Sequence, residues 1–173
     1  MKHLKLFGII CIVLFIVSFI VPTICVVRNI KFTQQCGGYL KQAADANTVE
    51  LAASRLDKAI EYIEANNLTD GYTSVLWKTE DDNVGFWYEN IIACRDELRV
   101  ISEKEDASQL EKSNILMKVR ESLLDNKGEN GDKITVPKGI SRYPYNALFG
   151  WLRFLSYLLM VVSFCGFLVI IDE

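Results

Sequence analysis

Histidine is almost absent from this chain, because the single histidine, His3, lies in a short tail before the first apolar run. Without another histidine, neither a Ser-His or Cys-His nucleophile pair nor a histidine-bearing metal site can form between the apolar runs. The sequence also lacks a GxxxxGK[S/T] or GxGxxG motif for phosphates and a CxxC pair for dithiol exchange. We therefore expect a protein that is not an enzyme, with no catalytic residue, no cofactor and no metal.

Basic charge is in short supply in the central part of the chain. Residues 29–146 carry fifteen Lys and Arg against twenty Asp and Glu, a net charge of about −5. Nucleic acids and anionic lipid surfaces both attract basic faces. We therefore expect no nucleic-acid partner and no broad adhesion of this region to anionic lipid.

Two long apolar runs raise the mean hydropathy of the chain to +0.16. No charged residue lies within residues 6–27 or 154–171, and each run is long enough to cross about 30 Å of hydrocarbon as a helix. The sequence therefore predicts an integral membrane protein that contacts the lipid bilayer. Its expected parts are a basic tail (1–5), a first transmembrane helix (6–27), an extramembrane helical domain (28–146), a second transmembrane helix with an interfacial start (147–171) and an acidic tail (172–173).

The first apolar run has a second interpretation, a cleaved signal peptide, because the basic stretch "MKHLK" precedes it. The run is longer than a typical signal peptide and no small-x-small cleavage site follows it, so we favour an uncleaved signal anchor. Lys and Arg beside the spans place the domain in the cytoplasm, but that rule applies to loops of up to about 60 residues. The basic start of a signal anchor favours cytoplasmic termini and a domain exported from a cell or inner membrane, for example into a periplasm.

Three of the five cysteines, Cys11, Cys25 and Cys165, lie in the predicted spans, where thiols behave as small apolar groups. The other two, Cys36 and Cys94, lie in the extramembrane domain. In an oxidising compartment, a disulfide between them would contribute about 3–4 kcal/mol. The alternative is two separate buried thiols, which we favour because Cys94 falls on the buried stripe of a predicted helix.

Small side chains recur at heptad spacing in both predicted spans. They are Cys11, Ser18 and Cys25 in the first span and Ser156 and Ser163 in the second. Small residues at this spacing allow helices to approach closely. The pattern indicates either an antiparallel hairpin of the two spans or contact with the helices of a membrane-protein partner or a second copy of the chain.

The region between the spans predicts a mainly α-helical fold, a bundle of three to four helices with a small extended patch. The first helix is expected to continue beyond its span, loosened at Gly37–Gly38. A second helix is predicted over residues 47–67, with a capping box from Asn47 to Glu50. Its expected buried stripe comprises Val49, Ala52, Leu56, Ala59, Ile60 and Ile63.

Two further helices and two extended segments are predicted after it. The third helix should run from about Asn83 to Ile101, and a fourth should follow a cap at Asp106. The expected buried stripe of the third helix is Val84, Trp87, Ile91, Cys94, Leu98 and Ile101, and that of the fourth is Leu110, Leu116, Met117, Val119, Leu123 and Leu124. Residues 73–76 and 134–139 are predicted to be extended and to pair with each other.

The stretch "YTSVLWKTEDDNVGFWYEN", residues 72–90, holds two of the three tryptophans. Large aromatic side chains that stay partly exposed are favoured at interfaces, so this stretch supplies a candidate partner or ligand surface. The candidate residues are Trp77, Asp81, Asp82, Phe86 and Tyr88. The alternative is that these residues form the core of a small domain, and we interpret Asp81 or Asp82 as the N-cap of the third helix rather than as an acid–base group.

Aromatic and basic residues precede and begin the second span. Amphipathic aromatic rings and arginines prefer the level of the lipid headgroups. The expected membrane-interface anchors are Arg142, Tyr143, Tyr145, Trp151 and Arg153.

These features together predict a non-catalytic two-span membrane protein that presents its helical domain to other proteins. It would act as an accessory subunit, a scaffold or an assembly factor of a membrane complex. Only Asp172 and Glu173 follow the second span, so a signal would pass to another polypeptide through helix contacts in the membrane. The alternative is an extracytoplasmic ligand sensor that signals through a separate partner.

Overall fold

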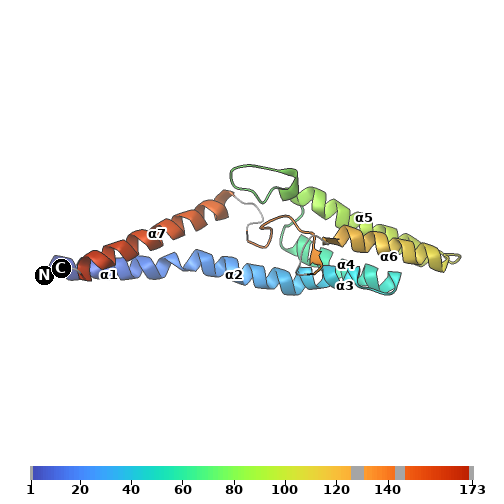
Figure 1. Cartoon of the computed structure of the whole chain (residues 1–173), viewed down its shortest axis with the longest axis horizontal. Coiled ribbons are helices and arrows are strands. Elements are labelled where there is room, and N and C mark those ends of the chain that lie inside the picture. The colour runs from blue at the N-terminus through green and yellow to red at the C-terminus, as the bar shows by residue number, and fades with distance from the viewer. Residues whose placement is uncertain (1, 126–130, 143–146, 172–173) are drawn as a thin grey trace.

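The computed structural model describes residues 2–125, 131–142 and 147–171. The chain is mainly helical with one small two-stranded sheet, as the sequence predicts. Figure 1 shows an elongated wedge in which two long helices lie together at one tip and diverge toward a helical domain at the other end.

A long rod of helix carries the chain from the first apolar run into the domain (Figure 1). The rod is interrupted at Phe19 because Pro22 has no N–H to donate to the carbonyl of Ser18. The predicted continuation beyond the apolar run is confirmed, and the loosening expected at Gly37–Gly38 takes the form of a π-helical turn that ends at Gly37. The rod comprises α1 (Lys2–Ser18), α2 (Ile20–Phe32), the π-helical turn η1 (Thr33–Gly37) and α3 (Gly38–Ala44).

Gly37 lies where the strand β2 (Lys133–Ile134) packs against the rod. A Cβ atom at this position would lie 2.8 Å from Ile134 Cδ1, closer than side-chain atoms normally approach. Glycine therefore permits the contact, and the neighbouring Cys36 is completely buried. The π-helical turn marks the point where the rod enters the domain core.

The helix α7 (Ala147–Ile171) returns antiparallel to α1 and packs along it. The small residues at heptad spacing are buried while most of their neighbours are exposed, which places them on the faces where the helices meet. They are Cys11, Ser18, Cys25, Ser156 and Ser163. A Cβ on Gly166 would lie 3.0 Å from Cys11 Sγ, so the approach is close there. The expected hairpin is confirmed, and both of its arms are long and apolar enough to cross a membrane.

Two helices of the domain carry the buried stripes that the sequence predicts. In α4 (Val49–Ala65) all six predicted residues are buried. In α5 (Val84–Glu103) five are buried and the last, Ile101, is half-buried. The two stripes face each other and pack together.

The residues that cap these helices differ from the predicted ones. Thr48, not Asn47, caps α4, and its Oγ1 accepts a hydrogen bond from the N–H of Leu51 at 3.2 Å. Neither Asp81 nor Asp82 caps α5, because the short 3₁₀ helix η2 (Glu80–Asp82) intervenes. Asn83 follows η2 and accepts the hydrogen bond of Phe86 N–H at 3.1 Å.

The helix α6 (Gln109–Leu123) begins with a capping box between Ser108 and Glu111, not at Asp106. The predicted apolar face is wrong at two positions, whose side chains face away from the helices that pack against α6. Val119 and Leu123 are buried, Leu116 is half-buried, and Leu110 and Met117 are exposed. Leu124 is buried, but it lies beyond the helix.

The extended patch forms from other segments than predicted. The strand β1 (Leu124–Asp125) pairs antiparallel with β2, so Leu124 faces Ile134. Residues 73–76 do not join this sheet; Thr73 N–H instead donates to the carbonyl of Asp82 at 2.9 Å. β1 and β2 are close in sequence, so their pairing closes a much shorter loop and costs less entropy than the predicted pairing.

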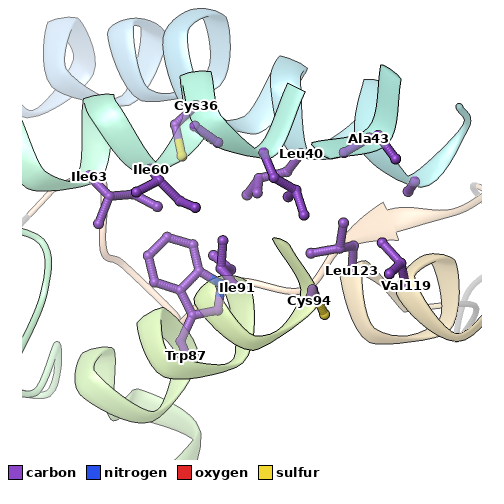
Figure 2. Packing of buried hydrophobic residues seen from close by; sticks show 14 of the residues in the cluster. Cys36, Leu40, Ala43, Ile60, Ile63, Trp87, Ile91, Cys94, Val119 and Leu123 are labelled. Carbon is purple, nitrogen blue, oxygen red and sulfur yellow. The ribbon is translucent and has the colours of Figure 1, made fainter. Parts of the chain in front are cut away.

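The core of the domain lies between the rod and three further helices. In Figure 2, Trp87 points from α5 toward Ile60 and Ile63 of α4. Phe32, at the end of α2, packs its ring 6.5 Å from the indole of Trp87. The rod therefore supplies part of the core: Phe32, Cys36, Leu40, Ala43 and Ala44.

Candidate functional site

The structure does not gather the five residues of the predicted partner surface. Trp77 is 77% exposed and lies in the loop before η2, while Phe86 is 61% exposed and lies in the first turn of α5. Asp81 lines the same groove as Phe86, whereas Asp82 lines a different one. Tyr88 turns to another side of α5.

Two of the five residues have structural roles. The Asp82 carboxylate accepts hydrogen bonds from the Oγ1 atoms of Thr73 at 3.1 Å and Thr79 at 2.7 Å, which holds the loop before α5. The Tyr88 hydroxyl donates to the Glu64 carboxylate at 2.8 Å and so joins α5 to α4. This hydrogen bond stabilises the protonated hydroxyl and raises the pKa of Tyr88.

Phe86 and Asp81 lie on a groove of about 590 Å³ beside the start of α5, here called the α5 groove. One wall comes from η2 and α5, and the other comes from the end of α6, from β1 and β2, and from the segment that follows β2. Residues that define it are Glu80, Asp81, Phe86, Asn90, Lys133 and Pro137. The second wall is not predicted from the sequence, because no local pattern in residues 133–137 indicates that they pack against α5.

Trp87 forms a rigid base for the α5 groove. Its side chain is 8% exposed, and its indole Nε1–H donates to the carbonyl of Thr135 at 2.9 Å. This hydrogen bond connects the two walls, since Trp87 belongs to α5 and Thr135 follows β2. The groove is therefore preformed, with an exposed phenyl ring and the carboxylates of Glu80 and Asp81 on one wall.

A second groove, also of about 590 Å³, lies on the side of the domain nearer the helical hairpin and is here called the hairpin-side groove. Its defining residues include Asn29, Val75, Asp82, Lys138, Ser141 and Arg142. Ile134, Val136 and Pro137 line both grooves, so this segment divides them. Ser141 Oγ donates to Asn29 Oδ1 at 2.6 Å and fastens the segment to α2.

Arginine side chains lie at the wide end of the hairpin. The Arg28 guanidinium lies 5.1 Å from the ring centroid of Phe149, which joins α2 to α7. Among the predicted interface anchors, Trp151 and Arg142 are exposed. Arg153 Nε donates to the Tyr157 hydroxyl at 3.2 Å. Tyr143 and Tyr145, also predicted as anchors, lie outside the described residues.

Cys36 and Cys94 are separate buried thiols, not a disulfide. Burial raises the pKa of Cys36 to about 12 and also raises the pKa of Cys94. Both thiols are part of the hydrophobic core between the rod, α5 and α6, where they act as small apolar side chains.

Within residues 2–125, 131–142 and 147–171, no three His, Cys, Asp or Glu side chains lie close enough together to hold a metal ion. We take the α5 groove as the candidate site, because it combines the exposed ring of Phe86, the carboxylates of Glu80 and Asp81, and the buried Trp87 at its base. Comparisons of the chain with protein-family models, with curated proteins and with solved structures give no match.

Proposed function

We propose that this chain is a non-catalytic, two-span integral membrane protein whose helical domain binds a protein partner through the α5 groove. Phe86 carries the proposal, since its phenyl ring is 61% exposed at the rim of a preformed groove. Burial of such a ring against a partner contributes about 1.5–3 kcal/mol. Exposed aromatic side chains beside a rigid pocket are typical anchors of protein interfaces.

The charges beside Phe86 define the chemistry of the partner. Glu80 and Asp81 lie on the same wall, and the only basic residue among the described residues that line the groove is Lys133, on the opposite wall. A partner segment with an apolar side chain flanked by Lys or Arg would complement the acidic wall, which favours fast and selective association. We expect the partner to present such a segment.

The rod supports a role as an accessory subunit, scaffold or assembly factor. Phe32, Cys36 and Leu40 of the rod are core residues of the domain, so the domain cannot rotate about a flexible linker. A partner bound in the α5 groove would be held at a defined height above the bilayer. We retain the signal-anchor topology, with cytoplasmic termini and an exported domain, as part of the proposal.

Affinity purification of the full chain from its native membranes tests this function. Partners should be identified by quantitative mass spectrometry for the unaltered chain, Phe86→Ala, Asp81→Lys and the control Val100→Ala, which alters another exposed apolar residue of α5. Loss of the Phe86 contact should lower recovery of the true partner about tenfold or more, because 1.4 kcal/mol corresponds to a factor of ten. Asp81→Lys should act in the same direction and Val100→Ala should not. Equal recovery by all four proteins would refute the proposal.

The ligand-sensor alternative draws support from the volume of the same groove. A cavity of about 590 Å³ is within the range of small-molecule sites, and Trp87 at its base would report occupancy through its fluorescence. The test is a metabolite screen of the full chain carrying Trp77→Phe and Trp151→Phe, so that only Trp87 emits. A saturable change would support the sensor, and the absence of any change would favour the protein-binding role.

A further inference from the structure

The loop between α4 and α5 contacts the beginning of α7. In Figure 1 the green loop before α5 lies beside the end of α7 that is nearest the domain. The contact is made by Val75 and Gly150, where a Cβ atom on Gly150 would overlap the Val75 side chain. A glycine in α7 therefore lets the loop rest directly on the helix backbone.

The position of Gly150 along the hairpin gives the depth of this contact. Cys11 lies against Gly166 near the narrow end, and Arg28 lies against Phe149 at the wide end. Cys11 and Arg28 are as far apart in the sequence as Phe149 and Gly166 are, so α7 stays in register with α1 and α2. Arg28 directly follows the first charge-free run, so Phe149 and Gly150 lie at the level where that run ends.

The length of α7 gives the same level independently. At about 1.5 Å per residue, the helix from Gly150 to its end at Ile171 spans about 32 Å. The hydrocarbon layer of a bilayer is about 30 Å thick. If the helix crosses a bilayer, Gly150 therefore lies at its boundary, and so does the loop that rests on it.

The side chains that the loop exposes at this level suit a lipid interface. Leu76 is 63% exposed and Trp77 is 77% exposed, and neither carries a charge. On α7 at the same level, Leu148 and Trp151 are also exposed. Tryptophan is enriched where hydrocarbon meets headgroups, since its ring is apolar and its N–H is polar. The Lys78 ammonium lies 5.2 Å from the ring centroid of Tyr72 and adds positive charge beside the headgroups.

We infer that Leu76 and Trp77 insert into the interfacial layer of the bilayer beside α7, so that the loop is a third attachment of the domain to the membrane. The occupant of this surface is lipid, whereas the α5 groove is the surface for a protein. The inference rests on the two-span topology proposed above. It assigns Trp77 a role that differs from that of Phe86, although both belong to the same stretch of sequence.

Three single-tryptophan forms of the full chain test this inference, because the chain contains only Trp77, Trp87 and Trp151. Each form keeps one tryptophan, has Phe at the other two positions, and is reconstituted in phosphatidylcholine vesicles with or without lipid brominated near the headgroup end of its acyl chains. Bromine quenches only indoles within contact distance. Trp151 is the membrane reference and the buried Trp87 is the domain reference. We expect Trp77 to be quenched as strongly as Trp151 and about threefold more strongly than Trp87.

Each outcome of the quenching experiment is decisive. Quenching of Trp151 but not of Trp77, with Trp77 open to aqueous acrylamide, would overturn the inference and leave the loop as a surface for protein. If Trp151 is also unquenched, the two-span topology itself fails and the inference fails with it. In the form that keeps Trp77, Leu76→Asp should lower the quenching to the level of Trp87, while the matched change Val100→Asp on α5 should leave it unaltered.

Discussion

Replacement of Trp87 by alanine should destabilise the domain more than any change on its surface. The indole is 8% exposed and contacts the core formed by α4 and the rod. Its Nε1–H also donates at 2.9 Å to the carbonyl of Thr135, which would lose its partner. Truncation of a buried Trp costs about 3–5 kcal/mol, and the lost hydrogen bond contributes about 1 kcal/mol of that cost.

Trp87→Phe separates the two contributions. Phenylalanine keeps most of the packing but cannot donate to Thr135, so we expect a cost of about 1–2 kcal/mol. The measurement is pulse proteolysis of the detergent-solubilised full chain over a urea series, because it detects unfolding of the domain without tryptophan fluorescence. With a slope of about 2 kcal/mol per molar urea, Trp87→Ala should lower the midpoint by about 1.5–2.5 M.

Trp77→Ala is the matched control, since it removes the same side chain from an exposed position. It should change the free energy of unfolding by less than about 0.5 kcal/mol. If Trp87→Ala lowers the urea midpoint no more than Trp77→Ala does, the conclusion that Trp87 packs between the rod and α4 is wrong. The description of the α5 groove would then also be wrong, because Trp87 connects its walls.

Three further predictions follow from single contacts. Gly37→Leu should cost about 1–3 kcal/mol, because even its Cβ would lie 2.8 Å from Ile134 Cδ1 and the longer side chain would overfill the contact between the rod and β2. Ile134→Ala should recover part of that cost in the double variant, and simple additivity in urea unfolding would contradict the contact. Burial raises the pKa of Cys36 from 9.0 to about 12. The free energy of unfolding should therefore fall by up to about 1.4 kcal/mol per pH unit as the pH rises through that range. Cys36→Ala should reduce this slope, which is measured by unfolding the protein below and above pH 9.0. The thiol introduced by Gly166→Cys should form a disulfide with Cys11 on oxidation, because the Cβ position lies 3.0 Å from Cys11 Sγ; non-reducing peptide mapping that finds linkage to another cysteine instead would contradict the helix register.

The features that the sequence predicts well are those encoded over a few turns of one segment. The stripes of α4 and α5 follow a helical period, and the small residues from Cys11 to Cys25 follow a heptad period. Both depend on one face of a helix meeting an apolar neighbour. The identity of that neighbour does not matter, so local periodicity is sufficient.

The features that the sequence does not predict depend on distant segments. Leu110 and Met117 continue the apolar pattern of α6, yet they are exposed, because the buried face of α6 is determined by where α3 and α5 pack against it. The α5 groove needs β2 and the segment after it as a wall, and β2 pairs with β1 instead of with the loop before α5. Val75, two residues before Trp77, lies against Gly150, far along the chain. These contacts join segments that are far apart in the sequence, so the periodicity of one segment does not predict them.

The π-helical turn at Thr33–Gly37 keeps the two parts of the rod facing the same core. An extra residue in a regular α-helix rotates everything after it by about 100°, whereas a π-helical turn holds one more residue within a single turn. The wider turn therefore takes up a residue while Phe32 before it and Leu40 after it both reach the core of the domain. One turn of unusual width thus lets a single rod contribute core side chains from both of its parts.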